Sequence, residues 1–217
     1  VVCKKNTFSE TSNKSKLENL QQNISITRED VIKTIVELDK HNTPIFSTTG
    51  MASRELYETR ISKKMKPIDF YTVGGMGCVS SIALGFARAS QHLKHVICID
   101  GDGSILMHMG SLFKSAKQPG FIHIVINNNA HDSVGGQPTN AFEIDFKKLG
   151  YSLGYDLCYS LTELKSFRQT MQKALEDKKI STLIEIKVRK GNRENLGRPK
   201  DHPQTNKEHF IEQWTNI

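Results

Sequence analysis

Two polar residues with metal-binding chemistry directly follow apolar runs of the sequence. Asp102 lies between glycines in Asp100-Gly-Asp-Gly-Ser104, and Asn128 lies in Asn127-Asn-Asn129. A carboxylate oxygen, an amide oxygen, a backbone carbonyl and phosphate oxygens make a typical Mg²⁺ shell. The pattern therefore predicts a magnesium site with Asp102 and Asn128 as ligands. Because three asparagines are adjacent, Asn129 stays open as a substitute for Asn128.

Glycine-rich turns at two predicted strand ends could bring the backbone close to an anionic ligand. Gly101, Gly103 and Ser104 surround Asp102 where a strand passes into a helix, and the first amides of such a helix attract phosphate. The run Thr72-Val-Gly-Gly-Met-Gly77 likewise follows a strand and opens a helix of small residues. The alternative is that both are ordinary turns, with Asp102 capping a helix.

His131, Asp132 and Ser133 follow the asparagines in a polar loop that spans residues 128–140. Histidine has an ordinary pKa of about 6.5 and is suited to proton transfer, so His131 is a candidate catalytic residue near a substrate carbonyl. Asp132 is a candidate catalytic partner, and Asp132 or Ser133 could orient the imidazole. The alternative is that His131 only caps the loop. His108, on a predicted helix, is interpreted as structural.

Strands and helices alternate regularly around these residues. Strands are expected at 44–47, 69–72, 95–100, 121–127, 156–159 and 182–188, and helices at 53–61, 76–90, 105–116, 142–149 and 161–177. An earlier helix is expected to begin with a capping box at Thr27-Arg-Glu-Asp30. The alternation predicts an α/β fold with a doubly wound, mostly parallel sheet of about six strands and helices on both faces. Ligands of such sheets bind beyond the carboxyl ends of the strands, where Asp102 and Asn128 are expected.

The order Gly-Asp-Gly followed by Asn-Asn resembles the cofactor motif of thiamine diphosphate enzymes. The resemblance implies that Asp102, Asn128 and the backbone carbonyl of Ala130 bind Mg²⁺, with the diphosphate completing the shell. It gives Met76 the role of an apolar wedge under the bent cofactor, and the Gly74 carbonyl a hydrogen bond to the pyrimidine amino group. The other cofactor-binding residues that it implies are Thr49, Gly50, Gly101, Gly103 and Ser104.

Longer matches resemble the phosphonopyruvate decarboxylase family, with sulfopyruvate decarboxylases as near relatives. They comprise Ser47-Thr-Thr-Gly50 with Ser53-Arg-Glu-Leu-Tyr57, the run 128–139, Arg189-Lys-Gly191 and Leu196-Gly-Arg-Pro199. The resemblance implies a thiamine diphosphate- and Mg²⁺-dependent lyase of phosphonate biosynthesis. It would convert 3-phosphonopyruvate, a small-molecule substrate, to phosphonoacetaldehyde and carbon dioxide. Candidate substrate-binding residues are Arg54 and Ser133, with Arg193 and Arg198 as weaker candidates.

Three residues depart from the family pattern. Gly75 stands where serine is usual, Cys78 where histidine is common and Asn129 where glycine is common. These departures leave cofactor binding intact in outline, and the choice between a phosphonate and a sulfonate substrate stays open. The alternative functions are the cofactor-binding subunit of a two-chain sulfopyruvate decarboxylase and a non-catalytic anion-binding module on the same fold.

The resemblance also implies a missing domain. The family needs a glutamate on a second α/β domain that binds the pyrimidine, and Glu10, Glu18 and Glu29 are poor replacements. Residues 1–23 are expected to hold the last strand of that domain and a linker, residues 24–190 the diphosphate- and Mg²⁺-binding domain, and residues 191–217 a basic C-terminal tail. The expected partner is the pyrimidine-binding domain of the same protein, from a second subunit of a homo-oligomer. The chain alone is expected to be inactive.

Composition excludes several other classes of protein. The net charge is +7, but lysines alternate with acids, and the basic stretch 187–200 has no interleaved aromatic residues, so a solvated tail is favoured over nucleic-acid binding. No apolar run approaches the roughly 20 residues of a membrane helix, and no signal peptide is visible. The four cysteines lie far apart, which disfavours a disulfide scaffold. We expect a cytoplasmic protein that binds neither membrane nor nucleic acid.

Overall fold

The computed structural model describes residues 4, 7, 24–39 and 43–215. The predicted strand end at residues 1–3, and the predicted linker apart from residues 4 and 7, lie outside these ranges. Six parallel strands form one sheet in the order β2-β1-β3-β4-β6-β5. The strands are β1 (Ile45–Ser47), β2 (Phe70–Tyr71), β3 (Val96–Gly101), β4 (Phe121–Asn127), β5 (Leu157–Leu161) and β6 (Thr182–Lys187). The predicted α/β fold with a parallel sheet is therefore confirmed.

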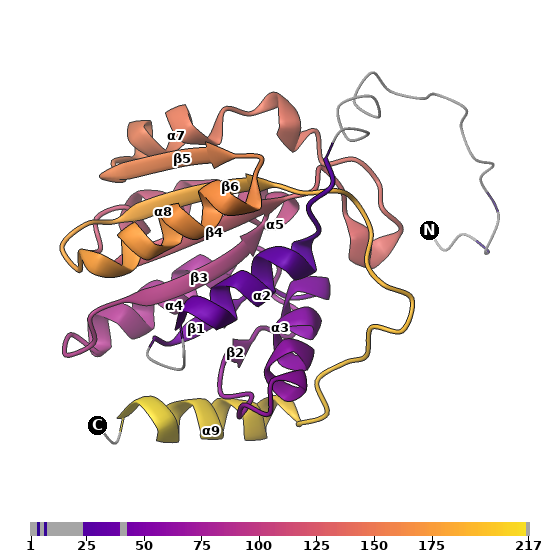
Figure 1. Ribbon diagram of the computed structural model, residues 1–217, viewed down its shortest axis with the longest axis horizontal. Coiled ribbons are helices and arrows are strands. Elements are labelled where there is room, and N and C mark those ends of the chain that lie inside the picture. The colour runs from indigo at the N-terminus through magenta and orange to yellow at the C-terminus, as the bar shows by residue number, and fades with distance from the viewer. Residues whose placement is uncertain (1–3, 5–6, 8–23, 40–42, 216–217) are drawn as a thin grey trace.

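Helices cover both faces of the sheet, as Figure 1 shows with α2 and α8 in front of the strands. One core is formed under α2 (Arg28–Asp39), α3 (Met51–Ser62) and α8 (Leu164–Glu176). The other is formed under α4 (Val79–Ala89), α6 (Leu112–Ser115), α7 (Phe146–Leu153) and α9 (Pro203–Thr215). Successive residues of the central strands enter opposite cores: Ile97 and Ile99 pack with α2 and α8, whereas Cys98 packs on the other side. This double burial explains the continuous apolar runs of these strands.

The start of α2 has the predicted capping arrangement. The backbone amide and hydroxyl of Thr27 donate to Asp30 Oδ2 at 3.0 and 2.6 Å, and the Asp30 amide donates to Thr27 Oγ1 at 3.0 Å. These bonds satisfy amides that a helix start leaves without partners. They also fix where the first helical residue, Arg28, enters the molecule.

Two predicted helices differ from the structure. The helix expected at 105–116 begins earlier, as α5 (Asp102–Met107), and is broken by a 3-10 turn (Met109–Ser111) before α6. Asp102 is therefore the first residue of a helix that starts directly after β3. The helix expected at 142–149 is displaced to α7, because the Asp145 side chain accepts the Lys148 amide at 3.0 Å and caps the helix there.

The expected basic tail contains a helix that belongs to the core. Phe210 and Trp214 of α9 are buried, and the Phe210 ring lies 4.9 to 5.6 Å from the rings of Phe46, Phe70 and Phe86. Residues 203–215 of the expected basic tail are therefore a helix that packs on the domain. The segment that joins β6 to α9, residues 188–202, is also held: the Arg189 amide donates to the Ile26 carbonyl at 2.8 Å.

No helix within the described ranges is both long and apolar enough to cross a membrane.

Candidate active site

A pocket lies at the carboxyl edge of the sheet, where the strand order changes direction. In the sheet, β2 lies on one side of β1 and β3 lies on the other, so the strand order reverses at β1. The crevice beyond such a switch point is the usual ligand site of this architecture. Residues that follow β1, β3 and β4 meet there. The pocket is lined by the predicted residues Thr49, Met76, Gly101, Asp102, Gly103, Ser104, Asn128, Ala130, His131, Asp132 and Ser133, and by the unpredicted Arg28, Thr48, Met51, Ala52, Asp100 and Ile126.

Asp102 is a buried carboxylate at the first position of α5. Its side chain accepts a hydrogen bond from the Thr139 hydroxyl, a partner that was not predicted. Burial raises the pKa of Asp102 to about 6, against the opposing effect of hydrogen bonds from Thr139 and from backbone amides. Among the described residues no ion pair involves Asp102. A carboxylate that is desolvated without a basic partner suits a hard cation, so this position fits the Mg²⁺ that the motif implies.

The three adjacent asparagines point in different directions. The Asn127 amide nitrogen donates to Glu185 Oε1 at 2.7 Å, inside the sheet. Asn129 has a positive φ of 53°, and its Oδ1 accepts the Phe142 amide at 3.1 Å. Asn128 alone of the three lines the pocket. The geometry therefore favours Asn128 over Asn129 as the predicted ligand.

Gly103 allows His131 to lie against the start of α5. A Cβ atom at this position would come within 2.5 Å of His131 Cε1 and within 3.1 Å of Thr139 Cγ2, so any larger residue would displace the imidazole or the loop. The loop itself is a narrow hairpin in which the His131 amide donates to the Gln137 carbonyl and Ala130 pairs with Pro138. His131 thus sits at the pocket wall, and its catalytic role stays a prediction.

Hydroxyl groups connect α5, the turn after β1 and the glycine turn before α4. Thr48, directly after β1, lies 3.0 Å from Ser104 through their side-chain oxygens. Ser104 Oγ also accepts the Gly77 amide at 3.0 Å, and the Gly74 amide donates to Thr49 Oγ1 at 3.3 Å. The glycine turn before α4 is therefore fixed beside the pocket, although Gly74 itself does not line it. Thr48 could have been found from its position at a strand end.

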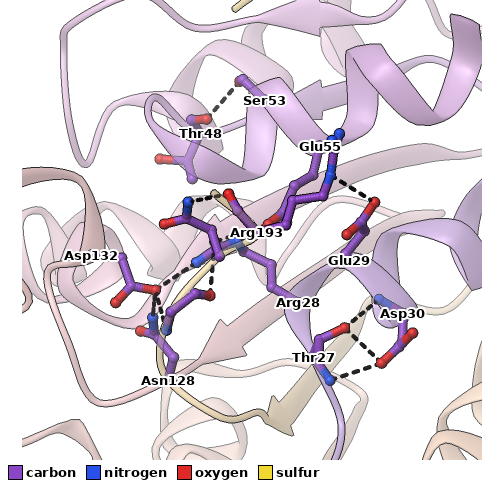
Figure 2. Close-up of polar contacts among 12 residues, drawn as sticks. Thr27, Arg28, Glu29, Asp30, Thr48, Ser53, Glu55, Asn128, Asp132 and Arg193 are labelled. Atoms are coloured by element: carbon purple, nitrogen blue, oxygen red, sulfur yellow. Dashed lines mark hydrogen bonds and ion pairs between the residues drawn. The ribbon is translucent and has the colours of Figure 1, made fainter. Parts of the chain in front are cut away.

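Among the described residues, no hydrogen bond joins the Asp132 carboxylate to the His131 imidazole. Figure 2 shows Asp132 between Arg28 and Asn128. One oxygen, Oδ2, accepts from Arg28 Nη1 at 3.0 Å, Asn128 Nδ2 at 2.6 Å and the Gly191 amide at 3.0 Å. None of these contacts involves His131, so the hypothesis that Asp132 orients His131 stays a prediction. Arg28 is a site residue that the sequence did not reveal, because its partners lie far away along the chain.

A second, larger pocket adjoins the first and shares Thr49, Met76 and Ser133 with it. Gly50 and Arg54 line this second pocket, as does Arg198 from the segment after β6. No salt bridge or side-chain hydrogen bond is formed by Arg54 or Arg198 with the described residues. Arg193, by contrast, pairs with Glu58 and with Glu29.

Cys98, Asp100 and His123 form a second group of potential metal ligands, fully buried under the pocket. The two ring nitrogens of His123 already face Tyr155 Oη at 2.9 Å and Asp100 Oδ2 at 3.4 Å. Because neither nitrogen is free, this group is a hydrogen-bonded part of the core. The donor set that fits a hard cation is the one around Asp102.

Comparison with known proteins agrees with this geometry. The family described as "Thiamine pyrophosphate enzyme, C-terminal TPP binding domain" matches residues 48–186, which include the Asp102 turn and the asparagine run. The chain belongs to the thiamine diphosphate-dependent decarboxylase family.

Relatives within the family differ in substrate and in length. Phosphonopyruvate decarboxylase of Streptomyces viridochromogenes is 37% identical over 161 residues, which are 73% of this chain and 39% of the relative. Sulfopyruvate decarboxylase subunit beta of Methanocaldococcus jannaschii is 35% identical over 162 residues, which are 72% of this chain and 81% of that subunit. The family member described here therefore spans about two fifths of the Streptomyces enzyme.

The fold of the decarboxylase domain is also seen in solved structures. Benzoylformate decarboxylase from Polynucleobacter necessarius superposes with a TM-score of 0.65 at 18% identity, over 80% of this chain and 35% of that one. At this identity the likeness concerns the fold alone.

Proposed function

We propose that this chain is the diphosphate- and Mg²⁺-binding domain of a decarboxylase that converts 3-phosphonopyruvate to phosphonoacetaldehyde and carbon dioxide. The observation that supports it most is the meeting of Asp102 and Asn128 beyond two neighbouring strands, beside a pocket with two arginines that have no carboxylate partner in the described part of the chain. The first pair supplies ligands for a hard cation. The arginines supply positive charge for a substrate that has two anionic groups.

In this proposal Asp102, Asn128 Oδ1 and the carbonyl of Ala130 hold Mg²⁺. Hydroxyl and backbone groups at Thr49, Gly50, Gly101, Gly103 and Ser104 bind the diphosphate, and Met76 and Gly74 contact the rest of the cofactor. When bound, thiamine diphosphate supplies an electron acceptor for the carbon–carbon bond that breaks. His131 supplies or removes a proton near the former ketone carbon. Asp132 acts through Asn128 rather than as a catalytic residue.

The substrate assignment rests on Arg54 and Arg198. Both guanidinium groups line the second pocket next to Met76, and both are without a carboxylate partner among the described residues. A guanidinium recognises phosphonate through charge-assisted, often bidentate hydrogen bonds. We propose that they bind the phosphonate, with Ser133 at the junction of the two pockets beside the reacting carbon.

The proposed partner is a pyrimidine-binding domain of the same protein, contributed by a second subunit of a homo-oligomer. Its glutamate would activate the cofactor, so the present chain alone would not release carbon dioxide. Val73 and Val134 line the second pocket and are each 71% exposed, which is consistent with a surface that another domain covers. The cytoplasmic location also remains a proposal.

A second candidate is the cofactor-binding subunit of a two-chain sulfopyruvate decarboxylase. It is supported by the match at 35% identity, which covers 81% of the beta subunit from Methanocaldococcus jannaschii. Sulfonate and phosphonate are both tetrahedral anions, so the same two arginines would serve either substrate. The sulfonate and the phosphonate differ in the charge on their third oxygen atom.

The test compares kcat/KM for 3-phosphonopyruvate, sulfopyruvate and pyruvate, with the chain combined with its pyrimidine-binding domain. The proposal predicts the highest value for 3-phosphonopyruvate and no carbon dioxide from the chain alone. Arg54→Gln and Arg198→Gln should each lower kcat/KM for 3-phosphonopyruvate about 10- to 100-fold, the effect of a lost charged hydrogen bond, with little change for pyruvate. Arg88→Gln, at the opposite edge of the sheet, is the matched control. Preference for sulfopyruvate would favour the second candidate, and equal efficiency on pyruvate would refute both.

A further inference from the structure

A buried ionic network ties the asparagine of the proposed metal site to the first residue of α2. Arg28 is 7% exposed and forms two parallel hydrogen bonds with Glu55, Nε to Oε2 at 2.8 Å and Nη2 to Oε1 at 3.0 Å. Its third nitrogen, Nη1, donates to Asp132 Oδ2 at 3.0 Å. Burial by itself lowers the pKa of Arg28, but the carboxylates of Glu55 and Asp132 outweigh this and raise it, so the guanidinium stays charged.

Asp132 in turn fixes the orientation of the Asn128 side chain. Its Oδ2 atom, which Arg28 holds, also accepts Asn128 Nδ2 at 2.6 Å. An amide whose nitrogen is held in this way has its oxygen direction fixed as well, because the group is planar. Asn128 Oδ1 also accepts the Ala130 amide at 3.2 Å, which joins two of the proposed Mg²⁺ ligands.

We infer that Arg28 is a positioning residue for the metal site, acting on Asn128 through Asp132, and that Glu55 holds Arg28 in place. The inference rests on the proposed function and extends it to residues that contact neither metal nor cofactor. Groups that orient metal ligands commonly change metal affinity 10- to 100-fold when they are removed. A guanidinium is required, because a lysine ammonium has no planar fork for Glu55 and a separate nitrogen for Asp132.

The chain contains a matched control for Arg28. Arg60 is fully buried and also binds two carboxylates, with two bonds of 2.8 Å to Asp69 and one of 3.0 Å to Asp39, but it lines neither pocket. Arg28→Lys and Arg60→Lys each remove one buried guanidinium from a two-carboxylate network. Both should lower the melting temperature, and only Arg28→Lys should weaken Mg²⁺ binding.

The experiment is calorimetric titration of Mg²⁺ at saturating thiamine diphosphate, with the chain combined with its pyrimidine-binding domain. We expect the Mg²⁺ dissociation constant to rise 10- to 100-fold in Arg28→Lys and to stay within about twofold in Arg60→Lys. Glu55→Gln keeps the side-chain shape and should raise it several-fold, which tests the network if Arg28→Lys does not fold.

Three results would overturn the inference. The first is an unchanged Mg²⁺ dissociation constant in folded Arg28→Lys, or in Glu55→Gln if Arg28→Lys does not fold. The second is an equal loss in Arg28→Lys and Arg60→Lys, which would show that metal affinity follows general stability. The third is absence of Mg²⁺ and cofactor binding by the unaltered protein, which would refute the proposed function and this inference with it. Normal binding by the unaltered protein and by folded Arg28→Lys would refute the inference alone.

Discussion

A buried carboxylate at the head of α5 destabilises the folded chain unless a cation lies beside it. The pKa of Asp102 is raised from an ordinary 3.8 to about 6. The folded carboxyl group therefore holds its proton more tightly than the unfolded one, and the free energy of unfolding falls as pH rises from about 4 to 6. Above pH 6 the full cost of the buried charge is present.

Asp102→Asn should therefore stabilise the metal-free chain. We expect a gain of about 1–3 kcal/mol at pH 7.5, since two pKa units correspond to a little under 3 kcal/mol, and little gain at pH 4. Urea unfolding in the presence of a chelator at both pH values measures it. Glu212→Gln on exposed α9 surface is the control and should change nothing. An Asp102→Asn chain that is less stable at pH 7.5 would contradict this account.

Substitutions of Asn128 and Asn129 should distinguish an effect on Mg²⁺ binding from an effect on backbone conformation. Asn129→Gly keeps a residue that tolerates the positive φ and loses only one bond to the Phe142 amide, so it should cost about 1 kcal/mol and leave Mg²⁺ affinity unchanged. Asn128→Ala should weaken Mg²⁺ binding at least 10-fold with cofactor present. Calorimetric titration of both variants decides which asparagine is the Mg²⁺ ligand. Weaker binding in Asn129→Gly and unchanged binding in Asn128→Ala would make Asn129 the ligand.

At the scale of elements, α9 should be an integral part of the domain. Trp214→Ala should lower the free energy of unfolding by about 3–5 kcal/mol, because a large buried side chain is lost from the core beneath α4. Ile211→Ala on the same helix is 46% exposed and should cost less than about 1 kcal/mol. Chemical denaturation of both variants measures the difference. Equal, small effects would mean that α9 is docked only weakly.

The sequence predicts the strands well and three of the helices poorly. β3, β4 and β6 are long β-branched runs buried on both faces, so their positions follow from composition alone. The helix at 105–116 is broken around His108, where its φ of −131° leaves the helical range, and no local signal marks this. α9 was missed because only Phe210 and Trp214 are buried apolar residues in an otherwise polar segment.

The candidate site was predictable where its chemistry is local and hidden where it is not. Asp102, Asn128 and the glycine turns stand next to strand ends, so topology alone brings them together. Arg28 has partners at Glu55 and Asp132, which lie 27 and 104 positions away along the chain, and no spacing in the sequence links them to Arg28. Long-range ionic contacts of this kind follow from packing and cannot be read from spacing.

At the scale of the whole molecule, cofactor and metal should stabilise the domain only together. If Mg²⁺ bridges Asp102, Asn128 and the diphosphate, either ligand alone binds weakly. With both at about 100 times their dissociation constants, the chain combined with its pyrimidine-binding domain should gain about 2.7 kcal/mol. Thermal unfolding with each ligand, with both, and after chelation measures it. If thiamine diphosphate with chelator gave the full increase in stability, the metal would not be part of the site.

The partners of Arg28 lie far from it in the sequence, which has a consequence for folding during synthesis. Its partners lie at Glu55, Asp132 and Gly191, so the last one is added to the growing polypeptide more than 160 residues after Arg28. Asp132 also takes its third hydrogen bond from the Gly191 amide. Until residue 191 has left the ribosome, the hairpin at residues 130–138 lacks one of its anchors, whereas the pairing of β3 with β4 needs only residues already made. The sheet can therefore form during translation, but the loop of the proposed metal site reaches its final order only after residue 191 has been made.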